Sequence, residues 1–186
     1  YKAFDLADRD RNPVLILADG VIGTMMEPVE LPEMKSEEEV AAIRESKKKW
    51  VCIGHELDLP NRSWIEPGQW DTNKMQRVNE EAAALYASWE KDVMVEEYCT
   101  EDAEVVITAY GISGRIAKSV VERMRAEGKK VGLIRPITVH PFPKAAFDKL
   151  DYGPCHAILD VEMSIPAQMV EDVDHAVRGR CPIKTC

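Results

Sequence analysis

The 186-residue sequence lacks the short cysteine and histidine patterns that usually bind metals. None of its five cysteines forms a Cys-x-x-Cys pair, which argues against an iron–sulfur ferredoxin domain and against a zinc ribbon. The four histidines form neither a His-x-x-x-His nor a His-Glu-x-x-His pattern. We therefore expect no metal site on this chain.

Long hydrophobic runs and an excess of positive charge are also missing. No apolar run is long enough to span a bilayer, and no signal peptide is recognisable. The net charge of -9 argues against a nucleic-acid partner, because phosphate binding needs clustered Lys and Arg. With an odd number of cysteines and no secretion signal, we expect reduced thiols in a cytoplasmic protein.

A strand, a tight turn, a helix and a second strand are predicted within residues 104–143. The run 105–109 is short and β-branched, as is typical of a strand buried on both faces. A helical pattern then continues to Gly128, where a left-handed helix end is expected. A second strand follows at 131–134. Because a helix connects them, the two strands should be parallel with a right-handed crossover.

The predicted helix in this block carries an apolar stripe. Ile116, Val120 and Met124 recur at every fourth position, and Ala117 and Val121 widen the stripe. The charged residues fall elsewhere on the helix. We therefore expect the stripe to pack on the sheet.

The remainder of the chain continues the same alternation. A short helix is expected at 144–150, a buried strand at 157–161 and a helix at 166–178, with Pro near its first position and Gly179 as its cap. Residues 181–184 can add a last strand. The predicted fold is an α/β, mostly parallel, open sheet with three layers.

We interpret the N-terminal part of the chain as the end of another α/β domain. An amphipathic helix is expected from residue 2 to about residue 9, followed by a buried parallel strand at 14–18. Such a strand needs neighbours on both edges, and no strand precedes it. We expect that an N-terminal part is missing and that residues 14–28 expose an apolar surface in the isolated chain.

The middle of the chain is predicted to connect two domains. Residues 36–49 form a helix in which Ser36 and Glu39 make a capping box. Residues 50–72 are irregular and contain three of the four Trp, so we interpret them as an interdomain or partner-contacting arm. A long helix is expected from 73 to about 97.

The turn Gly111-Ile-Ser-Gly-Arg115 is the first candidate site. It lies between a strand end and a helix start, where open α/β sheets usually bind ligands. Backbone N–H groups of Gly111 and Gly114, the Ser113 hydroxyl and the Arg115 guanidinium could bind an anion. The alternative is structural, with Gly111 permitting the turn and Ser113 capping the helix. The spacing matches neither the dinucleotide fingerprint nor the phosphate loop of NTPases.

Two weaker candidates follow other strands. His140 stands just after a strand, but no Ser or Cys in a nucleophile-elbow context accompanies it. Asp160 and Glu162 alternate on one strand and share a face, so they could share a proton or hold a cation. Alternatively, they cap the next helix or pair with Arg135 or Arg178.

Four motifs in order resemble the alpha subunit of the 2-oxoacid:ferredoxin oxidoreductases, with the branched-chain (2-oxoisovalerate) type nearest. They lie at residues 12–29, 104–117 and 131–138, and in the pair of segments 160–164 and 168–172. The resemblance covers most of the chain except 33–75.

The resemblance implies three parts. Residues 1–28 would be the C-terminal remnant of a thiamine-diphosphate pyrimidine-binding domain, 29–103 a linker arm with a long helix, and 104–186 a domain like the C-terminal domain of transketolase. The family's cofactor-activating glutamate lies upstream, and no residue here matches it. The resemblance therefore assigns no catalytic residue to this chain, which we expect to be inactive alone.

The resemblance also implies a reaction and partners. The complex would convert a 2-oxoacid and CoA to acyl-CoA and CO2 while reducing ferredoxin. Thiamine diphosphate, Mg2+ and iron–sulfur clusters would belong to the whole oligomer and not to this chain alone, with beta and ferredoxin-like (gamma/delta) subunits as partners. Two other functions stay open: a stand-alone α/β small-anion-binding or regulatory module, and a component of a 2-oxoacid dehydrogenase or transketolase-type enzyme that uses lipoamide.

Overall fold

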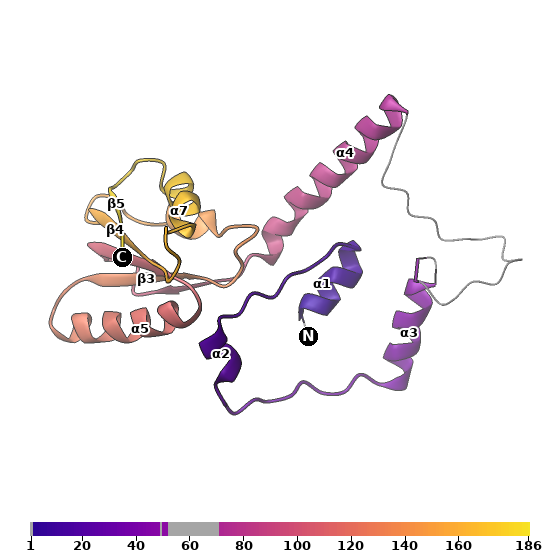
Figure 1. Ribbon diagram of the computed structural model, residues 1–186, viewed down its shortest axis with the longest axis horizontal. Coiled ribbons are helices and arrows are strands. Elements are labelled where there is room, and N and C mark those ends of the chain that lie inside the picture. Colours follow the sequence, from indigo (N-terminus) through magenta and orange to yellow (C-terminus); the bar gives the residue numbers. More distant parts are fainter. Residues whose placement is uncertain (1, 49, 52–70) are drawn as a thin grey trace, which may run out of the picture. The chain divides into compact units, whose positions relative to one another are not determined.

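The computed structural model describes residues 2–48, 50–51 and 71–186 (Figure 1). It contains two compact units. One unit joins Tyr1–Met25 to Ala83–Cys186, and the other comprises Met26–Ala82. The predicted irregular arm at 50–72 falls almost entirely outside the described residues.

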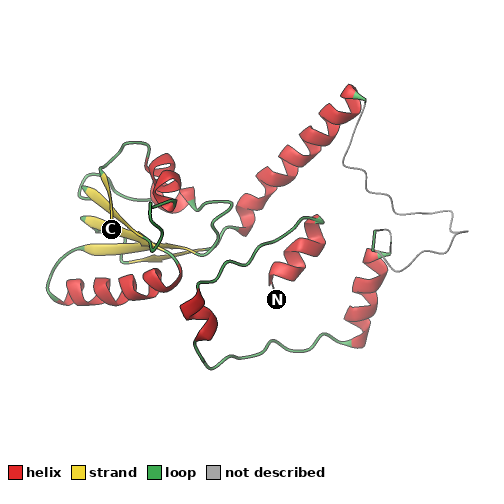
Figure 2. Ribbon diagram, in the orientation of Figure 1, coloured by secondary structure: helices red, strands yellow, loops and turns green. Residues whose placement is uncertain are grey.

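A five-stranded sheet forms the centre of the first unit (Figure 2). Its spatial order is β1-β3-β2-β4-β5, and only β1 runs antiparallel to its neighbour. The strands are β1 (Val95–Tyr98), β2 (Val105–Ala109), β3 (Val131–Pro136), β4 (Ala157–Val161) and β5 (Ile183–Thr185). The predicted parallel strands and the possible last strand are thus confirmed.

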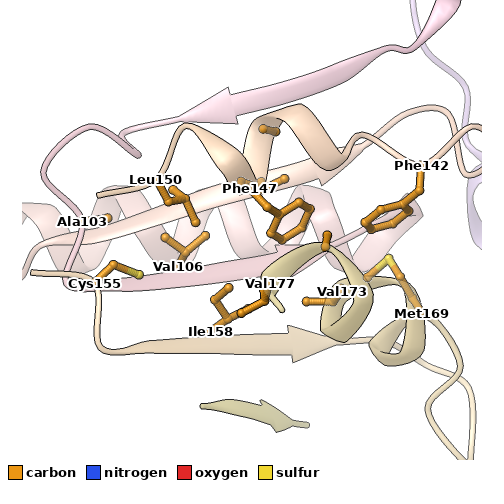
Figure 3. Close-up of a cluster of buried hydrophobic side chains, with 13 residues drawn as sticks. Ala103, Val106, Phe142, Phe147, Leu150, Cys155, Ile158, Met169, Val173 and Val177 are labelled. Carbon is orange, nitrogen blue, oxygen red and sulfur yellow. The ribbon is translucent and has the colours of Figure 1, made fainter. Parts of the chain in front are cut away.

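Helices cover both faces of this sheet. Side chains alternate along each strand, so Val106 and Ile158 face one layer while Ile107 faces the other. On the first face the strands pack against α6 (Lys144–Asp148) and α7 (Met169–Val177) around Phe142 and Phe147, as Figure 3 shows. On the second face they pack against α5 (Gly111–Ala126). The three-layer α/β fold is confirmed.

Helix α5 buries only part of the predicted stripe. Ala117 and Val121 are buried together with Gly114. Ile116 and Val120 remain 59% and 39% exposed. The prediction gave the larger residues the central place, whereas small residues let the helix approach the sheet closely, so the larger ones lie at its flank.

Helix α4 ends earlier than predicted, and a strand follows it. Helix α4 (Thr72–Ser88) gives way to a 3-10 turn (Trp89–Asp92) and then to β1, so the expected helix reaching residue 97 is wrong. Helical spacing of apolar residues continues through this segment. Strand β1 forms because its backbone pairs with β3, from Val95 opposite Pro136 to Tyr98 opposite Leu133.

Helix α7 also starts later than predicted. It begins at Met169 and not at Pro166, because residues 163–168 form a loop first. At its other end, Arg178 and Gly179 both adopt left-handed conformations, with φ of 54° and 71°. The glycine therefore continues a turn that Arg178 starts.

The N-terminal part of the first unit contains α1 (Lys2–Asp10), as predicted, and the short α2 (Gly20–Thr24). The expected strand at 14–18 is not formed; the segment is extended without a ladder partner. Its Leu15, Ile16 and Leu17 are 72–83% exposed. The expected apolar surface is therefore present, and the strand is absent because no neighbouring strand supplies hydrogen bonds.

The second unit contains α3 (Glu37–Lys47). Its capping box is formed as predicted: the Ser36 hydroxyl accepts from Glu39 N at 3.2 Å, and Glu39 Oε2 accepts from Ser36 N at 2.7 Å. Across the described parts of both units, no helix is long and apolar enough to cross a membrane.

Candidate functional site

The carboxyl ends of the parallel strands carry the candidate residues. Strand β2 leads into the Gly111 turn, and β4 leads into the loop 163–168 before α7. Strand β3 leads to His140. In open α/β sheets this edge is where ligands usually bind. The fold therefore gathers all the predicted candidates at one edge.

The Gly111 turn already holds a carboxylate from the same chain. Asp19 Oδ2 accepts a hydrogen bond from Ile112 N at 3.2 Å, in the first turn of α5. Asp19 Oδ1 accepts from Ile22 N at 2.8 Å and so caps α2 as well. Gly111 has a φ of +56°, and a Cβ there would lie 3.0 Å from Asp19 Oδ2. Asp19 thus occupies the place that was predicted for an external anion.

Charge and hydrogen bonding stabilise Asp19 in its ionised form. The N–H groups of Ile22 and Ile112, with the positive charge of Arg115, hold the pKa of the Asp19 carboxyl below its usual range. Sequence reasoning missed this role. The signal was available, because Asp19-Gly20 before an apolar segment also fits a helix N-cap.

The other residues of the turn serve the fold. Tyr110 is the N-cap residue of α5 and makes no side-chain cap, so the alternative in which Ser113 caps the helix is wrong. Gly114 is needed for close packing, since a Cβ there would lie 3.0 Å from the Arg135 side chain and 3.1 Å from Ala109 O. The helix consequently sits close against the end of β2.

Glu162 caps α7. Its Oε1 accepts from Gln168 N at 2.7 Å and Val170 N at 3.3 Å, and its Oε2 accepts from the Ser164 hydroxyl. Burial raises the pKa of Glu162, but the hydrogen bonds from the Ser164 hydroxyl and from the N–H groups of Gln168 and Val170 lower it, so the pKa of Glu162 is lowered overall. The predicted helix-capping alternative is therefore confirmed for Glu162.

Asp160 lies beneath the same helix without a donor. It is fully buried, and neither of its carboxylate oxygens has a hydrogen-bond partner. Burial and the neighbouring Glu162 raise its pKa to about 7. The predicted arginine partners lie elsewhere: Arg135 pairs with Glu96 at 3.1 Å, and Arg178 is 3.8 Å from Asp148. The expected pairing of Asp160 or Glu162 with either arginine is therefore wrong.

His140 is exposed and packs edge-on against Trp89, with ring centroids 6.3 Å apart. In the described part of the chain, no three His, Cys, Asp or Glu residues form a group that could hold a metal ion. Among the residues described at this edge, the arrangement offers capping and packing contacts and no nucleophile–base pair.

Comparison with known proteins finds relatives of this chain among the 2-oxoacid:ferredoxin oxidoreductases. Residues 103–186 match the model of the pyruvate:ferredoxin oxidoreductase core domain II. The chain is also 42% identical over 175 residues to a ketoisovalerate oxidoreductase subunit, VorB, of Methanothermobacter marburgensis. The chain is a homologue of 2-oxoacid:ferredoxin oxidoreductase subunits.

Two further relatives are more distant from this chain. A pyruvate synthase subunit, PorA, of Methanocaldococcus jannaschii is 30% identical over 144 residues, which is 71% of the chain and 37% of that subunit. The solved 2-oxoglutarate:ferredoxin oxidoreductase of Magnetococcus marinus shares the fold, with a TM-score of 0.55 over 69% of this chain and 24% of that one at 19% identity.

The match to the ketoisovalerate subunit covers 94% of this chain but only 47% of that subunit. The chain therefore spans about half the length of this relative. Within the matched region, the oxidoreductase core domain II corresponds to the strands and helices from β2 onward.

Proposed function

We propose that this chain is part of the alpha subunit of a thiamine-diphosphate-dependent 2-oxoacid:ferredoxin oxidoreductase of the 2-oxoisovalerate type. The observation that carries the proposal is the 42% identity to the ketoisovalerate subunit over almost the whole chain, against 30% to the pyruvate synthase subunit over a shorter stretch. The complex would convert a 2-oxoacid and CoA to acyl-CoA and CO2, and the two electrons released would reduce ferredoxin.

The role proposed for this piece is assembly. Among the described residues, no three His, Cys, Asp or Glu side chains form a group that could hold a metal ion, and we assign no cofactor step to them. They do offer an exposed, unpaired apolar segment at 14–18. Burial of such side chains contributes about 25 cal/mol per Å2, so this segment favours association.

The proposed domain division is the one that the family resemblance implies. Residues 1–28 would complete a pyrimidine-binding domain, 29–103 would form the linker arm, and 104–186 would form the transketolase C-terminal-like domain. The hydrogen bond from Ile112 N to Asp19 supports a fixed junction between the first part and the third. The Gly111 turn would then join domains, because the protein's own carboxylate already occupies its helix end.

An assembly experiment tests this function. The polypeptide that contains this chain is coexpressed with the beta and ferredoxin-like subunits, and copurification and 2-oxoacid-dependent, CoA-dependent reduction of a viologen dye are measured. We expect 2-oxoisovalerate to be oxidised faster than pyruvate or 2-oxoglutarate. Preference for another 2-oxoacid would refute the subtype, and a requirement for lipoamide would favour the dehydrogenase alternative.

A pair of variants tests the role of the segment 14–18. Ile16→Asp places a charge on the segment 14–18 and should abolish copurification, whereas Leu31→Asp, at an equally exposed leucine outside the proposed domain remnant, should leave it intact. Equal copurification of both variants would contradict the assembly role of the segment. Turnover by the isolated 186-residue chain would contradict the expectation that it is inactive alone.

The anion-binding alternative has its own test. CoA or an acyl phosphate is titrated against the chain, and binding lost in Arg115→Ala would favour a small-anion module at the Gly111 turn. We expect no such binding, because an added anion would have to displace Asp19 from Ile112 N.

A further inference from the structure

Two carboxyl groups lie side by side beneath the first turn of α7. Asp160 and Glu162 are two residues apart on β4 and its end, so their side chains point to the same face of the sheet. That face is the one covered by α6 and α7. Asp160 is fully buried and Glu162 is 8% exposed. Two ionised carboxylates in such a place would repel each other strongly.

The hydrogen-bond donors around the pair show which group carries the charge. Glu162 accepts from two backbone N–H groups and the Ser164 hydroxyl, which stabilise a carboxylate. Asp160 receives no donor at either oxygen. An ionised Asp160 would therefore be a buried charge without compensation, which costs several kcal/mol, whereas a protonated Asp160 can donate to Glu162.

Among the residues that the structure describes, no other group near Asp160 would favour its ionised form. Its neighbour on β2 is Thr108, which is uncharged, fully buried and equally without a hydrogen-bond partner. Its neighbour on β5 is Thr185, and Cys186 N donates to the Asp160 carbonyl at 2.9 Å. The core beneath α7 is apolar, with Met169 and Val173. Among the described residues, Glu162 is the only charged group that acts on this carboxyl.

We propose that Asp160 keeps its proton in weakly acidic solution, where an exposed aspartate is already ionised, and donates it in a hydrogen bond to the Glu162 carboxylate. This shared proton then holds the loop 163–168 and the start of α7 on the sheet, which is the contact that we call the lock. Loss of the proton would put two negative charges in contact. Glu162 would then release the backbone groups that it caps. The loop 163–168, at the carboxyl edge of the sheet, is thereby sensitive to pH.

The sign of the effect follows from the direction of the shift. The folded chain holds a proton on Asp160 at pH values where the unfolded chain has lost it. The free energy of unfolding therefore decreases as pH rises from the usual range of an aspartate pKa to about 7. Above pH 7 the decrease is complete, because Asp160 is then ionised in both the folded and the unfolded chain. This differs from a salt-bridged carboxyl, whose stabilisation is lost when pH falls.

Carbon-13 NMR of the Asp carboxyl groups in the full 186-residue chain tests the protonation directly. We expect one Asp resonance to titrate near pH 7, to disappear in Asp160→Asn, and to titrate at lower pH in Glu162→Gln, where the neighbouring charge is removed. A wild-type chain in which every Asp titrates near pH 4 would overturn the proposal without the need for any variant.

Thermal unfolding between pH 5 and 9 tests the lock. Asp160→Asn keeps the donor but cannot ionise, so its Tm relative to wild type should increase as pH rises. The matched control is Asp174→Asn on the exposed face of α7, whose Tm relative to wild type should stay constant. A Tm difference for Asp160→Asn that does not change with pH would refute the lock. If this variant does not fold, hydrogen exchange is measured at Gln168 N and Val170 N in wild type and corrected for the intrinsic exchange rate at each pH. Protection of these two groups should be lost above pH 7, and protection that persists there would also refute the lock.

Discussion

Gly132→Ala is expected to destabilise the sheet unit, because β3 passes the turn 99–103 without room for a side chain. A Cβ at position 132 would lie 2.6 Å from Cys99 O, 3.1 Å from Ala103 Cβ and 3.1 Å from Thr100 Cα. The nearest of these is a backbone atom, so no rotamer change can relieve the clash. The carbonyl or the strand must therefore move by roughly 0.4–0.8 Å to reach a tolerable contact.

Arg125 opposes that movement. Its Nη2 donates to Cys99 O at 2.6 Å, its Nη1 to Asp102 at 2.8 Å and its Nε to Val131 O at 2.7 Å. Shifting the turn would strain or break at least one charge-assisted hydrogen bond. Overpacking costs about 1–3 kcal/mol, and we place this case near the upper end, at ~3 kcal/mol.

Equilibrium urea unfolding followed by circular dichroism measures the effect. With a typical urea m-value of about 1–3 kcal/mol per M, a loss of ~3 kcal/mol lowers the midpoint by about 1–3 M. Gly23→Ala is the control, since nothing lies within 4 Å of its added Cβ. A Gly132→Ala midpoint equal to that of wild type, at unchanged m-value, would show that the turn yields freely and that the reasoning is wrong.

Three further changes test the core, the end of α7 and a thiol. Phe147→Ala should cost about 3–5 kcal/mol in urea unfolding because it empties the centre of the α6–α7 face, whereas the exposed Phe4→Ala should change little; equal effects would contradict the assigned core. Arg180→Lys should lower the free energy of unfolding by about 1–2 kcal/mol, because a lysine cannot keep the guanidinium hydrogen bonds to two carbonyls and to Asp148. Arg178→Lys is the control and should change stability little, because Arg178 lies 3.8 Å from the Asp148 carboxylate. A larger loss for Arg178→Lys than for Arg180→Lys would be inconsistent with this geometry. Burial raises the pKa of the Cys155 thiol, so peptide mapping should find it alkylated by iodoacetamide only as the chain unfolds, and rapid labelling of the folded chain would refute its burial.

Local patterns predicted the regular part of the fold well. The strands at 105–109, 131–134 and 157–161 were predictable because a short β-branched run bounded by turn residues has few alternatives. The capping box at Ser36 was equally predictable, since it involves only residues three apart. These features depend on neighbours in the sequence, and the structure confirms them.

Features that depend on distant partners were predicted less well. Strand β1 exists because β3 offers a free edge, and the run 14–18 has the composition of a strand but no edge to join. In α5, the sequence indicated an apolar stripe that includes the buried Ala117 and Val121, but it wrongly placed Ile116 and Val120 at the centre. The burial of each side chain depends on how closely the helix approaches the sheet, which periodicity does not show. A helical or extended pattern is thus a poor predictor of secondary structure where pairing with a distant strand decides the conformation.

The candidate site shows the same division between sequence and tertiary structure. Sequence alone determined that the chain is an acidic α/β protein with Gly111 at a strand-to-helix turn and with Asp160 and Glu162 on one face of a strand. Only the tertiary structure decided that Asp19 occupies the start of α5, that Glu162 caps α7 and that Asp160 is buried without a donor. The physical reason is that a carboxyl group's protonation and partners depend on burial and on donors from other elements, which no local pattern in the sequence specifies.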